Sequence, residues 1–381
     1  MKKFTIIKVV LIIVIIININ KNYLPFFMKK YKFIFITLIA FGCTIENIDP
    51  NEKKVNSLIA EIIDSNNLPG LSVSVMKNDE IVYSKGFGYA DIESKTQIIP
   101  SSTKFRIGSF SKTLTASALM KLVEKNELNL NESIHTYVPE FPEKNWNFNL
   151  KQLGGHLSGI RHYKGNEFYI NKNYENVIDA LDIFKDDPLL HEPGTKYYYS
   201  THAWTLISAA IEKASETPFL EYMYKNVFEP LGMKNTYAET IDMNIKDKVT
   251  YYKKDNSGDI KIETKVNNSW KWAGGGFIST TEDIVNFLHS HSKSGYLTDE
   301  SLNILMSPQT TASAGTTNYG IGWRKRYGNN NEILYGHTGG SVGGTTYAFI
   351  AIDHNVIVVI TSNLSDASFD NLPNDIFEIY Y

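Results

Sequence analysis

The sequence of 381 residues contains only one cysteine, Cys43. A single cysteine excludes an internal disulfide framework and cysteine-rich zinc sites. The nine histidines never form a His-Glu-x-x-His pattern, so this common zinc motif is absent from the sequence as well. The sequence therefore predicts no metal and no other cofactor.

The body of the chain also lacks a block of lysine and arginine residues. Its formal charge is -3 at pH 7, and its pI is near 6.3. A nucleic-acid surface needs clustered positive charge, so the composition argues against a nucleic-acid partner. With 43% hydrophobic residues, the chain can bury a large core as one broad domain or as two closely packed lobes.

Two short apolar runs lie near the amino terminus. After Met28, three lysines lead into the apolar residues 33–41 and then Gly42-Cys43, which is the layout of an export signal. This segment resembles a bacterial lipoprotein signal, in which the cysteine after the cut is lipidated. The other run, residues 9–17, is shorter than the roughly 20 residues of a membrane span. Either Met28 is the true start or residues 1–27 form an extra anchor, and we favour the first. The alternative for Cys43 is a buried free thiol.

We accordingly divide the chain into residues 1–27, a signal peptide at 28–42, a short tether at 43–51 and a domain at 52–381. Both interpretations place the domain outside the cytoplasm. The expected location is a bacterial cell envelope, with a lipid on Cys43 as the membrane anchor.

Periodicity predicts strands at both ends of the domain and helices between them. Apolar residues at helical spacing predict a helix over 55–64, and a hairpin follows at 71–87. Four more strands are expected at 320–325, 333–337, 347–352 and 356–362, with a turn at 353–355 and a last helix at about 369–379. The middle is rich in helices, including 203–215 and 219–228. The sequence thus predicts a mixed α/β fold, in which an antiparallel sheet built from both termini is flanked by helices and carries an inserted helix-rich lobe.

Four serine and lysine pairs share the Ser-x-x-Lys spacing, and their contexts differ. The pair at 74–77 falls on a predicted strand, where residues three apart face opposite sides. The pairs at 101–104 and 290–293 lie in segments expected at the surface. Only Ser109 follows a glycine and opens a helix with apolar residues at helical spacing, so one turn brings Lys112 over Ser109. The alternative is a capping serine beside an exposed lysine.

A lysine that serves as a base must first lose its proton. With an ordinary pKa near 10.4, making the amine neutral at pH 7 costs about 4.6 kcal/mol. Burial and a nearby positive charge would reduce this cost. A serine at a helix start has a second advantage, because free backbone N–H groups face an oxyanion that forms there.

Five motifs occur in order along the chain. They are Ser109-Phe-Ser-Lys112, His156-Leu-Ser-Gly159, Pro193-Gly-Thr-Lys-Tyr-Tyr-Tyr-Ser-Thr201, Trp272-Ala-Gly-Gly-Gly276 and His337-Thr-Gly-Gly340. In this order and spacing they resemble the serine β-lactamases and penicillin-binding peptidases, in the class C-like branch. Longer phrases such as WKWAGGGFIST and GHTGG resemble a mitochondrial serine β-lactamase-like branch. The likeness runs from about residue 52 to the end and implies a β-lactamase/transpeptidase-like fold.

The resemblance implies roles for particular residues. Ser109 would be the nucleophile. Lys112 and Tyr199 would share the work of the general base, which we assign to the pair because the two groups titrate together. The backbone N–H groups of Ser109 and Gly340 would form the oxyanion hole. The alternative for Tyr199 is a packed aromatic residue in a tyrosine-rich chain.

Other conspicuous residues are interpreted as structural. The triple glycine at 274–276 is not followed by a Gly-Lys-Ser/Thr sequence, so we read it as tight packing near the cleft rather than a phosphate loop. Residues 280–283 have the pattern of a helix capping box. His156 and Arg161 are expected to support the site rather than to take part in its chemistry.

Two positions depart from the family pattern. Thr201 stands where an asparagine is expected, and one hydroxyl should hold a substrate amide less firmly. His337 stands where a lysine is expected, and a histidine with a pKa near 6.5 is mostly neutral at pH 7. The expected substrate-binding strand thus consists of His337, Thr338, Gly339 and Gly340. We expect it to bind a substrate carboxylate only weakly. Efficient penicillin hydrolysis is not expected. We also expect His337 to set a pH limb of activity near neutrality.

The sequence therefore predicts an exported, lipid-anchored serine hydrolase that forms an acyl-enzyme on Ser109. Its substrates would be peptides or esters, including peptides derived from peptidoglycan, with β-lactams turned over slowly at most. Two alternatives stay open. One is a catalytically weak protein that self-associates into filaments, and the other is a cell-wall-binding protein that kept the fold without turnover.

Overall fold

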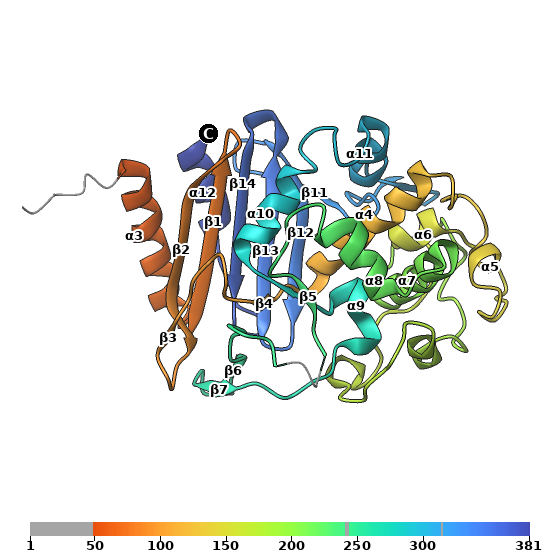
Figure 1. The fold of residues 1–381 in the computed structure, drawn as a ribbon, viewed down its shortest axis with the longest axis horizontal. Coiled ribbons are helices and arrows are strands. Elements are labelled where there is room, and N and C mark those ends of the chain that lie inside the picture. Colours follow the sequence, from red (N-terminus) through yellow and green to blue (C-terminus); the bar gives the residue numbers. More distant parts are fainter. Residues whose placement is uncertain (1–48, 241–243, 314) are drawn as a thin grey trace, which may run out of the picture. The chain divides into compact units, whose positions relative to one another are not determined.

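The computed structural model describes residues 49–240, 244–313 and 315–381 (Figure 1). Residues 1–27, the predicted signal peptide at 28–42 and the predicted lipidation site Cys43 lie outside this part of the chain. The residues from Pro50 onward form one unit. None of the helices in the described ranges is both long enough and apolar enough to cross a membrane.

The central sheet joins the two ends of this unit. Its seven strands follow the order β11-β12-β13-β14-β1-β2-β3, and each neighbouring pair is antiparallel. The early strand β1 (Gly70–Lys77) lies against the late strand β14 (Val356–Ser362). The other strands are β2 (Glu80–Asp91), β3 (Thr96–Gln97), β11 (Arg324–Tyr327), β12 (Ile333–Ser341) and β13 (Gly344–Ala351). The prediction of an antiparallel sheet built from both termini is confirmed (Figure 1).

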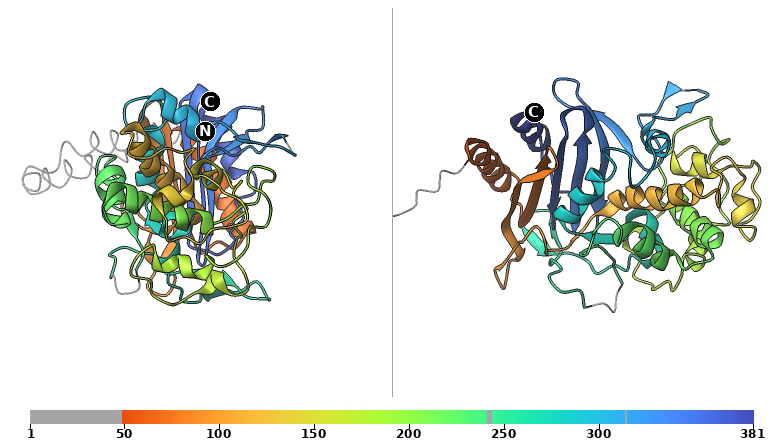
Figure 2. Two further views of the ribbon diagram at one scale, coloured as in Figure 1. Left: turned by 90° about the vertical axis from the view of Figure 1, so that its right-hand side faces the viewer. Right: turned by 45° about the horizontal axis from the view of Figure 1, so that its top comes forward.

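Two helices cover one face of this sheet. α3 (Pro50–Ser65) and α12 (Leu372–Tyr380) pack against each other, and α12 also packs on β14. Alternate residues of a strand face the same side, so Val73 of β1 and Val358 of β14 join Val55 of α3 in one apolar cluster. The helix-rich segment lies on the other side of the sheet, as the right view of Figure 2 shows.

Helix α10 (Thr281–His289) covers the second face of the sheet. Its first residue, Thr281, hydrogen-bonds through its hydroxyl with Ser72 at 2.9 Å and with Ser74 at 2.8 Å. Thr280 caps the helix, because its hydroxyl accepts a bond from the Asp283 backbone N–H. β1 is therefore apolar toward α3 and joined to α10 by hydroxyl groups.

The inserted lobe consists mainly of short helices. They are α4 (Ser111–Glu124), α5 (Ile134–Tyr137), α6 (Leu150–Gly154), α7 (His202–Ser215), α8 (Phe219–Met223), α9 (Trp272–Gly275) and α11 (Asp299–Met306), with 3-10 turns η1 (Gly108–Phe110), η2 (Glu167–Tyr169), η3 (Asp179–Ile183) and η5 (Ser269–Lys271) and one π turn, η4 (Tyr224–Phe228). A further 3-10 turn, η6 (Ile352–His354), lies outside the lobe and connects β13 to β14. Small sheets pair β4 (Phe105–Arg106), β5 (Tyr237–Ala238) and β8 (Phe277–Ser279); β6 (Tyr252–Lys254) and β7 (Ile260–Ile262); and β9 (Thr310–Thr311) and β10 (Gly315–Thr316).

Helix α4 runs through the centre of this lobe. Every residue from Ser111 to Met120 is buried, including the polar ones. The sequence predicted one buried face, but α4 packs against α7, α9 and α11 and is enclosed on all sides over this stretch. The helix that follows Ser109 is therefore held rigidly by its neighbours.

Several boundaries differ from the prediction. β11 begins at Arg324 rather than at residue 320, because the Gly320 N–H bonds to the Trp323 carbonyl and folds the chain into a turn. β12 continues past His337 to Ser341. Two residues expected at the surface are buried. Lys104 lies over the ring of Tyr237, and the His291 ring bonds with Ser117 at 2.8 Å.

Candidate active site

Ser109 lies in a tight turn between a short strand and a buried helix. β4 is fixed by pairing with β8, and the chain then passes through η1 into α4. Gly108 has a φ of +49°, and a Cβ on it would come within 2.6 Å of the Gly340 carbonyl oxygen. Only glycine fits both the left-handed backbone and this close approach. The turn therefore presses Ser109 against β12.

Lys112 occupies the first turn of α4 and has no exposure to solvent. Its Nζ lies 3.1 Å from Ser109 Oγ, 3.2 Å from Thr201 Oγ1 and 2.5 Å from the Gly274 carbonyl oxygen. Burial lowers the pKa of Lys112 well below its usual range, and the positive charges of Arg324 and Lys271 lower it further. The predicted approach of Lys112 to Ser109 is present in the structure.

Tyr199 completes the cluster from the segment just before α7. Its ring centroid lies 4.9 Å from Lys112 Nζ, and Tyr199 and Ser109 line the same pocket. Burial raises the pKa of Tyr199, which outweighs the opposing effects of Ser109 and Arg324. The phenol is therefore protonated at neutral pH. The structure brings Ser109, Lys112 and Tyr199 together, as the sequence predicted.

The glycines of β12 form the opposite wall of the site. A Cβ on Gly339 would lie 1.9 Å from the Ile107 carbonyl oxygen, so the strand can approach the Ser109 turn only without a side chain there. A Cβ on Gly340 would meet nothing within 4 Å. β11 pairs with β12 only as far as Gly336. Among the described strands, none pairs with that edge of β12 beyond this point, and the backbone beside Gly340 faces the pocket.

His337 lies inside this wall and is fully buried. Its Nε2 is 2.9 Å from the Tyr319 hydroxyl, and its Nδ1 bonds with the Thr338 carbonyl oxygen. Burial lowers the pKa of His337 well below its usual range, with Arg324 and Lys112 acting in the same direction. The imidazole thus stays neutral throughout the neutral range. The expectation that His337 sets a pH limb near neutrality is wrong, because it assumed the ordinary histidine pKa near 6.5 and burial lowers that pKa.

Arg324 is a site residue that the sequence analysis missed. Its guanidinium lies 5.4 Å from the Tyr199 ring centroid, and its charge opposes the rise in the pKa of Tyr199. Its Nε is 3.5 Å from His337 Nε2. Among the described residues, no carboxylate lies within ion-pair distance of Arg324. A cation therefore faces the pocket from β11, beside the histidine that replaces the expected lysine.

The segment from His156 to His162 supports Tyr199 from behind. The Ser200 N–H donates to His156 Nδ1 at 3.1 Å, and the Thr201 N–H donates to His162 Nδ1 at 3.2 Å. The Ser200 hydroxyl donates to the Arg161 carbonyl at 2.6 Å. These bonds hold the backbone on the C-terminal side of Tyr199, which agrees with the supporting role expected for the segment.

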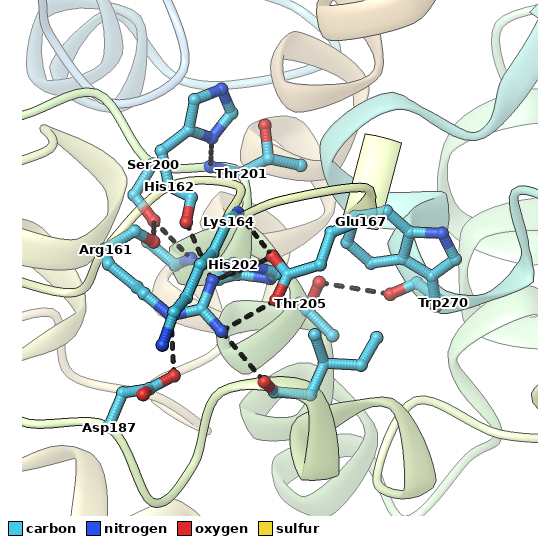
Figure 3. Close-up of polar contacts among 12 residues, drawn as sticks. Arg161, His162, Lys164, Glu167, Asp187, Ser200, Thr201, His202, Thr205 and Trp270 are labelled. Atoms are coloured by element: carbon cyan, nitrogen blue, oxygen red, sulfur yellow. Dashed lines mark hydrogen bonds and ion pairs between the residues drawn. The ribbon is translucent and has the colours of Figure 1, made fainter. Parts of the chain in front are cut away.

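Arg161 anchors that segment to two others, as Figure 3 shows. Its guanidinium binds Glu167 at 2.8 and 2.9 Å and Asp187 at 2.6 Å. Burial opposes ionisation of Glu167, but bonds from His202 and Arg161 outweigh it and lower the pKa of Glu167 to about 2. Arg161 thereby fixes the loop that carries Tyr163 and Phe168.

One pocket of about 240 Å³ contains the predicted group and several residues that the sequence did not reveal. Ser109, Tyr199, Thr201, His337, Thr338 and Gly340 all line it. His162, Tyr163, Phe168 and Arg324 line it as well. His162 and Tyr163 end the motif-like phrase HLSGIRHY that begins at His156, whereas no local motif marks Phe168 and Arg324. A larger hollow of about 570 Å³ begins at Thr338, Gly339 and Gly340 and extends toward α12. The smaller pocket is the one that contains the Ser109 hydroxyl.

Comparisons with known proteins agree with this geometry. Residues 55–379 match the Beta-lactamase family. The human mitochondrial serine beta-lactamase-like protein LACTB is 29% identical over 408 aligned positions, which cover 82% of this chain and 73% of that protein. The structure of the octameric penicillin-binding protein homologue from Pyrococcus abyssi is similar, with a TM-score of 0.73 at 26% identity over 86% of this chain and 76% of that one.

A D-amino acid amidase from Ochrobactrum anthropi SV3 has a similar fold, with a TM-score of 0.72 at 23% identity over 86% of this chain and 96% of that one. The family match covers almost the whole described unit, and its most characteristic motifs meet in one pocket. The chain belongs to the beta-lactamase family of serine hydrolases.

Proposed function

We propose that the protein forms an acyl-enzyme on Ser109 and hydrolyses small amides or peptides that carry a free carboxylate, with esters as a second class. The observation that carries this proposal is the buried Lys112 amine, 3.1 Å from the Ser109 hydroxyl and free of any carboxylate partner among the described residues. A lysine of lowered pKa beside a serine is a suitable general base.

In the first step, Ser109 Oγ attacks the scissile carbonyl carbon while its proton passes to the neutral Lys112 amine. The protonated amine then returns that proton, through the Tyr199 phenol, to the departing nitrogen or oxygen. Water cleaves the resulting ester by the reverse proton path and restores Ser109. The raised pKa of Tyr199 and the lowered pKa of Lys112 favour the neutral amine and phenol over the charged alternative.

The backbone supports the oxyanion in this proposal. The N–H groups of Ser109 and Gly340 lie on the two elements that the glycine contacts press together. Donors fixed in this way need no rearrangement as charge develops on the carbonyl oxygen. Their alignment depends on the close approach of η1 to β12.

Arg324 favours an anionic substrate. An arginine without an acidic partner binds a carboxylate through two parallel hydrogen bonds. Neutral His337 cannot supply a positive charge. Arg324 therefore binds the substrate carboxylate in place of the lysine that the family pattern has at the position of His337. Among the similar structures is a D-amino acid amidase complexed with L-phenylalanine amide, which supports small amides as a substrate class.

A fluorophosphonate probe tests the nucleophile. We expect the purified protein to be labelled on Ser109 and the Ser109→Ala variant to be unlabelled. Absence of labelling in the folded wild-type protein would refute the proposed chemistry.

Matched peptides test the substrate class. A panel of D-amino-acid peptides with a free carboxylate should be cleaved faster than the same peptides ending in an amide. In Arg324→Gln this preference should fall about 10- to 100-fold, since a hydrogen bond to a charged group contributes about 1.5–3 kcal/mol. Arg326→Gln, changed on the same strand but outside the 240 Å³ pocket, should keep the preference. Equal cleavage of both peptide forms by the wild type would rule out a carboxylate requirement.

We also propose that copies of the chain associate, because the similar Pyrococcus abyssi homologue is octameric. Light scattering of the purified protein across a range of concentrations would show whether assemblies form. A monomer at every concentration would contradict this proposal and leave the catalytic one untouched.

A further inference from the structure

A second lysine is buried beside the site, and the proposed reaction does not use it. Lys271 ends η5 and is only 2% exposed. Its Nζ lies 4.6 Å from the Phe168 ring centroid, 5.1 Å from that of Trp270 and 5.3 Å from that of Tyr163. We call these three rings the aromatic box. Ring faces attract a cation, so the box can hold the ammonium without an acid.

The box leaves Lys271 without a counter-ion. Among the described residues, no hydrogen-bond acceptor and no carboxylate lies within bonding distance of its Nζ. Glu167 is next to Phe168 in sequence, but its oxygens bond with Arg161, His202 and the Lys164 N–H. The Lys271 charge is therefore not held in an ion pair, and the carboxylate that attracts it, Glu239, is itself paired with Arg106 at 2.5 Å. The field of Lys271 reaches the neighbouring groups.

The walls of the box are fixed from two sides (Figure 3). Arg161 holds Glu167 and so the loop that carries Tyr163 and Phe168. From the other side, the Thr205 hydroxyl donates to the Trp270 carbonyl at 3.2 Å and ties Trp270 to α7. The position of Lys271 is thus set by the same network that supports the catalytic segment.

Both buried lysines lie against one glycine turn. Lys112 Nζ bonds with the Gly274 carbonyl oxygen. A Cβ built on Gly275 would lie 4.0 Å from Lys271 Cδ and 3.8 Å from the carbonyl carbon of Gly108, next to the nucleophile. Tyr163 and Phe168 are also walls of the catalytic pocket. Lys271 therefore lies directly behind the proposed reaction centre.

We propose that Lys271 is a positioning residue whose charge, kept without a counter-ion by the aromatic box, holds the Lys112 amine in its neutral, basic form. Two ammonium groups at one turn repel each other, so the Lys271 charge favours loss of the proton from Lys112. The importance of this effect for turnover rests on the proposed function, whereas the effect on Lys112 itself does not.

The electrostatics of the surrounding groups agree with this arrangement. Burial lowers the pKa of Lys271 to about 7, with Arg106 acting in the same direction and Glu239 opposing it. Lys271 in turn lowers the pKa values of Lys112 and His162. Tyr163 faces Lys271 as a neutral ring of the box. The two lysines form a coupled pair that gains protons in two steps.

The pH profile of fluorophosphonate labelling tests the proposal. In wild type, the labelling rate should rise with pH as Lys112 loses its proton. Lys271→Met removes the charge and nearly keeps the shape of the side chain. This variant should move the limb about one pH unit upward, so that labelling at a pH below the limb becomes about tenfold slower. Lys271→Arg should keep the wild-type position, and so should the control Lys293→Met, at an exposed lysine. A limb that does not move in folded Lys271→Met overturns the proposal.

A titration of the lysine side chains by NMR tests the same proposal without activity. In the intact wild-type protein, two lysine amines, assigned with Lys112→Arg and Lys271→Arg, should titrate below the other lysines and should affect each other. Independent titration of the two overturns the proposal, and this test remains if Lys271→Met fails to fold. If the wild type is not labelled but the amines are coupled, the proposed function fails and this inference stands.

Discussion

At the residue scale, Lys112 is held at the start of α4 by polar contacts that do not include an acid. A buried cation without a partner is costly, so the folded protein disfavours the proton on this amine. In the unfolded chain this amine is exposed to water, so the proton is not disfavoured there. The same feature that makes Lys112 a base therefore makes the folded state sensitive to pH.

The first prediction concerns stability. The pKa of Lys112 is lowered in the folded state, so the unfolded chain binds the extra proton once the pH falls below about 10.5, the ordinary lysine value. Wild type should then lose stability relative to Lys112→Met as the pH decreases toward the lowered value, by up to about 1.4 kcal/mol per pH unit. Urea unfolding of both proteins between pH 6 and about 10 measures the difference. A difference that does not depend on pH would contradict this account of Lys112.

The second prediction concerns His337, which is buried and stays neutral. Replacing it with glutamine keeps a polar group toward Tyr319 and removes no titration in the neutral range. The position of the limbs in the pH profile of His337→Gln should therefore match wild type between about pH 6 and 8, even where the rate is lower. Loss of a limb in this range would contradict this account and support the titrating histidine that the sequence predicted.

The sequence could predict the residues that lie inside motifs. Ser109, Lys112 and Tyr199 could be chosen because each stands at a recognisable position before or within a helix. Arg324 could not, because it lies outside every quoted motif, and the role of Lys271 could not be predicted although it lies within WKWAGGGFIST. Their importance comes from the absence of an acid nearby, and only the folded chain shows which groups are neighbours. The burial of His337 was missed for the same reason.

At the scale of elements, the site depends on how closely η1 approaches β12. Gly339 contacts the backbone of Ile107, whereas Gly340 faces open space. A side chain is excluded at Gly339 by backbone packing, whereas at Gly340 it would only enter the open space of the pocket. Substituting each glycine in turn therefore distinguishes the effect of packing from the effect of pocket shape.

The third prediction uses this pair. Gly339→Ala should lose about 3 kcal/mol or more of stability and label more than about 100-fold more slowly, because the added methyl group would overlap a carbonyl oxygen and push the strand away. Gly340→Ala should keep its free energy of unfolding within about 0.5 kcal/mol. Thermal unfolding and probe labelling report both effects. Similar stability of the two variants would show that the strand can shift without cost.

Strand and helix boundaries were predicted well where the apolar pattern was regular, as in β1 and β14. The start of β11 was misplaced, because residues 320–323 are apolar and glycine-rich but fold into a buried turn. The extension of β12 through two glycines was also missed. Glycine has little strand preference of its own, and the extension follows from pairing with β13.

At the scale of the whole molecule, the sheet and the helical lobe share one core. A single apolar cluster includes Leu119 of α4, Trp204 of α7, and Ile350 and Val359 of the sheet. The sheet itself joins the first and last parts of the described unit through β1 and β14. Neither part can be removed without exposing the apolar surface of the other.

The fourth prediction is that the two parts unfold together. The five tryptophans, at positions 146, 204, 270, 272 and 323, lie outside the strands of the seven-stranded sheet, so their fluorescence reports on the lobe. Far-UV circular dichroism includes the sheet. Because the core is shared, both signals should change at the same urea concentration. Separate midpoints would indicate two independent folding units.

Helix α4 has neighbours on every side, and this restricts how relatives of the protein can diverge. A changed residue in its enclosed stretch would require matching changes in several other helices at once. The exposed loop residues within 161–188 and 244–268 meet fewer such demands. New substrate preferences in this lineage should therefore arise by mutation of those loops, while the enclosed helix is inherited nearly unaltered.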